Sequence, residues 1–188
     1  MACRRVTMTR RLQVLPLKVL FTGMAFLLSS GFVAPSALSQ TENTFQDANL
    51  GISVSVPAGW TKEPGPFLSK SILVRFKRGH SFIELQGFLV GKTNFDLLEY
   101  ARFQVANTRK LMGAKPVHEP EKVIVGNREA VVTLSQASIL TFTMKILDYC
   151  FYDLTRKRLY HVRLGSPEAT LQRDTPDFLS AVQSFTIQ

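Results

Sequence analysis

The amino-acid sequence indicates an α+β domain in which helices pack on an antiparallel sheet. Several short segments alternate apolar with polar residues, as half-buried strands do, and only two segments carry the signals of a helix. These segments follow one another as hairpins, helix, meander and helix, without the regular strand–helix alternation that a parallel sheet requires. We therefore expect one domain of the α+β class.

A basic and then apolar segment precedes this pattern. Five basic residues and no acidic one fall within the first 39 positions, and residues 19–33 are mostly apolar. This stretch is short for a membrane span, which needs about 20 apolar residues, and Ala37-Leu38-Ser39 offers small side chains to a signal peptidase. We expect residues 1–39 to be a cleaved signal peptide and residues 40–188 to be a single periplasmic or extracellular domain. The alternative is an uncleaved helix that anchors the domain to a membrane.

Cleavage after Ser39 would change the charge and the cysteine count. The remaining 149 residues hold 18 basic and 14 acidic side chains, a net charge of +4. This modest charge gives no reason to expect a nucleic-acid partner. A chain of this length buries its own core without metal or disulfide bonds. Cys3 would leave with the signal peptide, so Cys150 would remain alone in an apolar run and is expected to be a buried thiol. No cofactor is predicted.

The first half of the domain reads as strands followed by one helix. Residues 52–56 form a strand that ends at Pro57-Ala58-Gly59, and Trp60 is expected to close one end of the core. Residues 62–71 read as a loop, and residues 72–78 and 81–90 as a β-hairpin.

The helix is predicted between caps at Thr93 and Asn94 and a C-terminal Gly113, with Asp96 complementing its dipole. Phe103 falls off the apolar stripe of this helix. It is interpreted either as a residue covered by a neighbouring loop or as an aromatic side chain that contacts a partner. The stripe that should face a sheet consists of Leu97, Leu98, Ala101, Val105, Thr108 and Met112.

The second half reads as a meander closed by a helix. A hairpin turns at Gly126-Asn127, and residues 139–153 form a long strand whose apolar positions change phase, which indicates a bulge or burial on both faces. Residues 159–164 form the next strand. Thr175-Pro176-Asp177 predicts the start of a second helix, and residues 184–187 a closing strand.

This layout resembles the PsbP-like superfamily, an α/β/α sandwich that includes a photosystem II subunit, a Ran-binding protein and exported domains of the DcrB type. The matching residues are the strand that runs into Pro57-Ala58-Gly59-Trp60, the hairpin at residues 125–130, and Phe178 followed by Ser184-Phe185. They span nearly the whole predicted domain. The resemblance implies a non-enzymatic binding or assembly role outside the cytoplasm.

No group of residues forms a recognisable catalytic or metal-binding motif. His80, His118 and His161 lie far apart in the sequence, without the short ligand spacing of structural zinc sites. No serine lies in a nucleophile elbow, and Cys150 has no histidine in a known local signature. Glu119 and Glu121 flank a proline and read as an exposed segment. We expect neither a metal site nor catalysis.

Two basic turns are the candidate binding features. They could converge on one rim of the sheet and attract an anionic membrane surface or an acidic protein. The alternative is that they are solvated turn charges that prevent edge-to-edge pairing of strands. The residues are Arg75, Lys77 and Arg78 in the first turn and Arg156, Lys157 and Arg158 in the second.

The function that the sequence favours is an exported, non-enzymatic binding or assembly factor with a protein partner in the cell envelope, or in the thylakoid lumen if the host is photosynthetic. One alternative is a structural or stress-related envelope protein without a specific partner. Another is a hydrolase with an unrecognised site.

Overall fold

The structure is a computed structural model, and it describes residues 43–65, 67, 69–139 and 142–188. The predicted signal peptide, its cleavage after Ser39 and the alternative anchor helix at residues 19–33 lie outside the described residues. The described residues contain antiparallel sheets with two helices packed on them, so the α+β prediction is confirmed.

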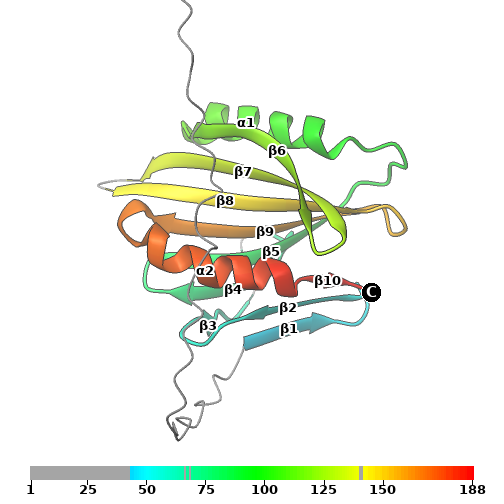
Figure 1. The fold of residues 1–188 in the computed structure, drawn as a ribbon, viewed down its shortest axis with the longest axis horizontal. Coiled ribbons are helices and arrows are strands. Elements are labelled where there is room, and N and C mark those ends of the chain that lie inside the picture. The colour runs from blue at the N-terminus through cyan, green and yellow to red at the C-terminus, as the bar shows by residue number, and fades with distance from the viewer. Residues whose placement is uncertain (1–42, 66, 68, 140–141) are drawn as a thin grey trace, which may run out of the picture. The chain divides into compact units, whose positions relative to one another are not determined.

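Seven strands form the larger sheet, in the order β3-β4-β5-β9-β8-β7-β6, and all neighbours in it are antiparallel (Figure 1). Both predicted hairpins are present. In the second hairpin, which turns at Gly126-Asn127, the two strands are longer than predicted. The strands are β3 (Thr61–Lys62), β4 (Ile72–Arg78), β5 (Ser81–Leu89), β6 (Lys115–Val125), β7 (Arg128–Ile139), β8 (Phe142–Asp153) and β9 (Arg158–Pro167).

A separate three-stranded sheet joins the two ends of the described chain. Its order is β1-β2-β10, from β1 (Asn43–Asp47), β2 (Ile52–Val56) and β10 (Thr186–Ile187). Sequence reasoning found β2 and the closing strand but not β1, and it did not foresee that they form a second sheet. The closing strand is also shorter than predicted, because Ser184 still belongs to the helix before it.

Helix α1 (Leu97–Met112) lies across β6, β7 and β8 on one face of the larger sheet (Figure 1). Its N-cap is Asp96, whose carboxylate accepts from the backbone N–H groups of Leu98 and Glu99, and not Thr93 or Asn94 as expected. The predicted C-cap is confirmed: Gly113 has φ 65°, the left-handed conformation that glycine adopts without a side-chain clash.

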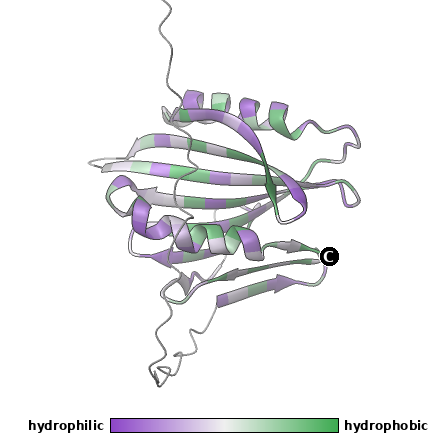
Figure 2. Ribbon diagram, viewed as in Figure 1, coloured by the Kyte–Doolittle hydropathy of each residue, from purple (hydrophilic) through white to green (hydrophobic). Residues whose placement is uncertain are grey.

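Helix α2 (Glu168–Ser184) covers the opposite face together with the small sheet. The prediction that it starts at Thr175-Pro176 was wrong, because Pro176 lies inside the helix. Pro176 lacks the N–H that would bond one turn back, while the Thr175 hydroxyl donates to the Leu171 carbonyl at 2.7 Å. Figure 2 shows α2 changing from mostly purple at its start to green further along, where Phe178, Ala181 and Val182 are buried.

Two hydrophobic cores therefore lie on the two faces of the larger sheet. On the α1 side, Cys150 packs with Leu97 and Ala101, and on the α2 side Phe151 packs with Phe178 and Trp60. The pairing of β8 with both neighbours runs without a register shift, so burial on both faces and not a bulge explains its change of apolar phase. Trp60 is 2% exposed, which confirms its core position.

Candidate functional site

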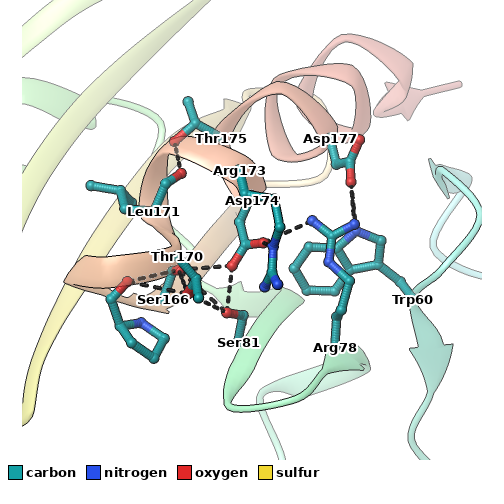
Figure 3. A network of polar contacts seen from close by, with 11 residues as sticks. Trp60, Arg78, Ser81, Ser166, Thr170, Leu171, Arg173, Asp174, Thr175 and Asp177 are labelled. Carbon is teal, nitrogen blue, oxygen red and sulfur yellow. Dashed lines mark hydrogen bonds and ion pairs between the residues drawn. The ribbon is translucent and has the colours of Figure 1, made fainter.

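Arg78 joins the β4–β5 turn to helix α2 in a network of polar contacts (Figure 3). Its guanidinium lies over the Trp60 ring, 4.4 Å from the ring centroid, and donates to Asp177 Oδ2 at 2.6 Å and to Asp174 Oδ1 at 2.8 Å. Trp60 Nε1 donates to the same Asp177 oxygen at 3.1 Å. The positive charge of Arg78 is thus matched by two carboxylates.

Asp174 is the buried centre of this network. Its side chain is fully buried, and its Oδ2 accepts from the hydroxyls of Ser81 and Ser166. Burial favours the neutral acid, but hydrogen bonds from Arg173, Ser81, Arg78 and Ser166 outweigh it and hold the pKa of Asp174 well below its usual range. Because these contacts join the β4–β5 turn to α2, with only Arg78 Nε left without a partner among the described residues, we interpret the network as a structural link.

The other two basic residues of the first turn are also paired. Arg75 donates to Glu84 at 2.9 Å, and Lys77 forms an ion pair with Glu63 at 2.5 Å. The two basic turns do not converge on one rim. Strand β5 begins opposite the end of β9, where Phe82 pairs with Gly165, and ends opposite Arg158, so the turns lie at opposite ends of the sheet.

The second basic turn lies beside exposed apolar side chains. Leu89 is 71% exposed and pairs with Arg158, and Leu154, 61% exposed, follows directly after β8. The β5–α1 connection reaches the same end of the sheet, at the right in Figure 1, where the Tyr152 hydroxyl donates to the Lys92 carbonyl. Phe103, 60% exposed, borders a surface hollow together with Lys92 and Phe95. We define the turn surface as Leu89, Leu154, Arg156, Lys157 and Arg158 at this end of the sheet, and we add the exposed Phe103 of α1 to it.

The charges of the turn surface are only partly paired. Arg156 contacts Asp153 at 3.0 Å, whereas Lys157 and Arg158 have no ion pair among the described residues. Lys157 is exposed and adopts φ 53° in the turn. This end of the domain therefore offers apolar area next to unneutralised positive charge.

A row of alternating charges crosses the sheet on the face that carries α1. Arg75 of β4, Glu84 of β5, Arg163 of β9 and Asp148 of β8 are direct cross-strand partners in turn. Glu84 and Asp148 are buried, and Arg163 Nη2 donates to Asp148 Oδ2 at 2.7 Å. Burial alone would raise the pKa of Asp148. The positive charge of Arg163 and the hydrogen bonds from Arg163 and His161 outweigh this effect and keep the pKa well below the usual range.

Beside this row, His161 contacts Asp148, Cys150 and Tyr100. His161 Nδ1 lies 2.9 Å from Asp148 Oδ2, and since a carboxylate only accepts, this nitrogen carries the proton. His161 Nε2 then accepts from the Tyr100 hydroxyl at 3.2 Å, which itself accepts from Gln104 at 2.6 Å. The chain of hydrogen bonds ties α1 to β9.

Cys150 is not activated by this arrangement. Its Sγ lies 3.4 Å from His161 Nδ1, the nitrogen already bonded to Asp148. Burial raises the pKa of the thiol, and the negative charge of Asp148 adds to this effect. A thiol nucleophile needs a neighbouring base and a lowered pKa, so this cluster lacks the features of a cysteine hydrolase.

The same three side chains form the group closest to a metal site within the described part of the chain. The ligand atoms of Asp148, Cys150 and His161 lie within 4.8 Å of one another, and all three residues are buried. Metal binding would require the Cys150 thiolate and a His161 Nδ1 without its proton. Sequence reasoning missed this cluster because His161 reaches it from another strand. The i, i+2 spacing of Asp148 and Cys150 on one strand was the available signal.

Comparison with known proteins identifies the fold and no family. No family model matches the sequence, and no curated protein matches it. Cyanobacterial PsbP (CyanoP) from Synechocystis sp. PCC 6803 has a TM-score of 0.63 at 12% identity, covering 86% of this chain and 99% of that one. The chain has a PsbP-like fold.

Two further solved structures share this fold at low sequence identity. LpqN of Mycobacterium tuberculosis, described as involved in cell envelope biogenesis, has a TM-score of 0.58 at 10% identity and covers 80% of this chain and 87% of its own. The Saccharomyces cerevisiae Ran-binding protein Mog1p has a TM-score of 0.51 at 15% identity, over 79% of this chain and 96% of its own. Within the described residues, neither helix has the length and apolar composition needed to cross a bilayer.

Proposed function

We propose that this chain is an exported, non-enzymatic binding or assembly factor of the cell envelope, which contacts a protein partner through the turn surface. The observation that carries the proposal is the exposure of Leu89 and Leu154 beside Lys157 and Arg158, which have no ion pair among the described residues, together with the exposed Phe103 of α1. Exposed apolar side chains that gather at one place are typical of interaction sites.

The charges of the turn surface define the chemistry of the partner. Apolar anchors bordered by cations fit a protein surface with apolar side chains and acidic groups around them, because complementary charges steer association and fix orientation. The PsbP-like fold supports this function by analogy, since proteins that share the fold include one described as Ran-binding and one described as involved in cell envelope biogenesis.

The export part of the proposal is tested by expressing the full chain in a bacterial host. Intact mass and fractionation should find a soluble periplasmic protein that begins at Gln40, because the N-terminal 39 residues have the composition of a signal peptide. An intact chain in the membrane fraction would contradict cleavage and make the domain a tethered one.

The binding part is tested by retention of a partner from an envelope extract of the organism that produces the chain. A triple change of Arg156, Lys157 and Arg158 to Ser and, separately, Phe103→Ser should each abolish saturable retention of the same protein at low salt. A matched triple change of Arg109, Lys110 and Lys115 to Ser, and Leu179→Ser on α2, serve as controls and should leave it unchanged.

The other outcomes separate the alternatives. Retention on anionic vesicles that depends on the basic turn and not on Phe103 would assign a membrane surface in place of a protein. Equal retention by all variants would exclude the turn surface as the binding site. The absence of any saturable partner would favour a structural envelope protein.

A further inference from the structure

A cavity of about 190 Å³ lies between α1 and the charged row of the larger sheet. Its walls come from α1 (Gln104, Val105, Thr108) and from the strands β5, β7, β8 and β9. The sheet residues that line it are Phe82, Thr133, Ser135, Ile146, Asp148 and Arg163. This volume is below the range of about 300–1,000 Å³ that holds drug-sized ligands, so an occupant must be small.

Polar groups without protein partners gather at this cavity. Asp148 is 6% exposed, and its Oδ1 is buried without a hydrogen bond, although its Oδ2 is bonded to both His161 and Arg163. The hydroxyls of Thr133 and Ser135 have no hydrogen-bond partner among the described residues either. The two hydroxyls are therefore free to bond to a ligand in the cavity.

Arg163 adds donors on the same side. Its Nε and Nη2 bond to Asp148, but its Nη1 lies 3.8 Å from Glu84, beyond hydrogen-bonding distance. A guanidinium has five N–H groups, so Arg163 retains donors for a ligand. Thr133 and Ser135 offer acceptors beside the donors of Arg163, the arrangement that two neighbouring hydroxyl groups complement.

The net charge of the site selects against an ionic ligand. Arg75, Glu84, Arg163 and Asp148 alternate in sign across four strands, so the row is neutral as a whole. An ion entering the cavity would lose its hydration without meeting an excess of opposite charge. Phe82 and Ile146 supply apolar wall that suits the C–H face of a small ligand.

We propose that this cavity binds a small neutral molecule with neighbouring hydroxyl groups, of the polyol or monosaccharide class, whose hydroxyls bond to Arg163, Thr133 and Ser135. This ligand site goes beyond the proposed partner binding and uses none of the residues of the turn surface.

The test is titration of the purified protein with glycerol, erythritol, myo-inositol and D-glucose. Binding is monitored by the amide shifts in NMR spectra. At least one probe should give saturable shifts of Gln104, Thr133, Ser135 and Arg163. Thr133→Val and Ser135→Ala should each weaken that binding about fivefold, since each removes one hydrogen bond. Ser138→Ala, an exposed position on the opposite face of β7, is the matched control and should leave it unchanged.

Three results would overturn the proposal. The first is that none of the four probes gives saturable shifts at these residues, and the second is that all variants bind equally. The third is that methylammonium or acetate saturates the same shifts as strongly as the best polyol, because the cavity would then not select against an ion. Circular dichroism of each variant verifies that a loss of binding does not reflect unfolding.

Discussion

Asp148 is a buried residue with a negative charge, and its neighbours compensate for the cost of burying that charge. Arg163 and His161 both donate to its Oδ2, and the lowered pKa follows from these contacts. Removing the charge would leave Arg163 without its closest counter-ion. The stability of the fold should therefore depend on this residue and on its ionisation.

We predict that Asp148→Asn lowers the free energy of unfolding by about 3 kcal/mol at neutral pH, as expected when one member of a buried ion pair is removed. Because the folded pKa lies below the unfolded value of about 3.9, the stabilisation is complete above that pH and is lost as the pH falls toward the folded pKa. Thermal melts of the wild type and the variant should converge in acid. A difference that stays constant with pH would contradict this account.

Gly165 is a position where space and not backbone conformation requires glycine. A Cβ there would lie 2.3 Å from the ring of Phe82, its cross-strand partner and a wall of the cavity. We predict that Gly165→Ala destabilises the domain by about 1–3 kcal/mol or displaces Phe82, as overpacking does. Urea unfolding measures the loss.

Gly87→Ala on β5 is the matched control for this substitution. Its added Cβ would lie 3.0 Å from the end of the flexible Leu73 side chain, so its effect should be smaller. Equal losses for the two variants would show that the Phe82 contact is not the cause.

Between elements, Arg78 is the main link from the β4–β5 turn to α2. It bridges Asp174 and Asp177 and covers Trp60 (Figure 3). Arg78→Ala should cost about 2 kcal/mol, less than for a fully buried pair because the Arg78 side chain is 23% exposed. Lys77→Ala, next to it on the same strand, should have a much smaller effect. Chemical denaturation compares the two, and similar losses would exclude the bridge as the cause.

At the level of the whole domain, we predict that folding is independent of metal. The Asp148 carboxylate is already held by Arg163 and His161, and the pKa of Cys150 is raised, so the cluster does not depend on a cation. EDTA should leave the melting temperature unchanged. A large drop that added zinc reverses would identify Asp148, Cys150 and His161 as ligands.

Much of the secondary structure could be predicted because its causes are local. The alternation of Ile52, Val54 and Val56 and the left-handed turn at Gly113 depend on a few adjacent residues. Helix α2 was placed wrongly because Pro176 is a strong local signal against a helix interior, and packing against the sheet overrides it.

The candidate sites, in contrast, depend on which strands become neighbours. The pairing of Glu84 with Arg163 and of Arg163 with Asp148 creates the charged row, and the same pairing places the two basic turns at opposite ends of the sheet. Local patterns establish that the chain forms strands and an amphipathic helix, since these follow from residue periodicity. Strand order and register alone bring Asp148, His161 and Cys150 together, because contacts between residues distant in the sequence follow from the packing of the complete domain.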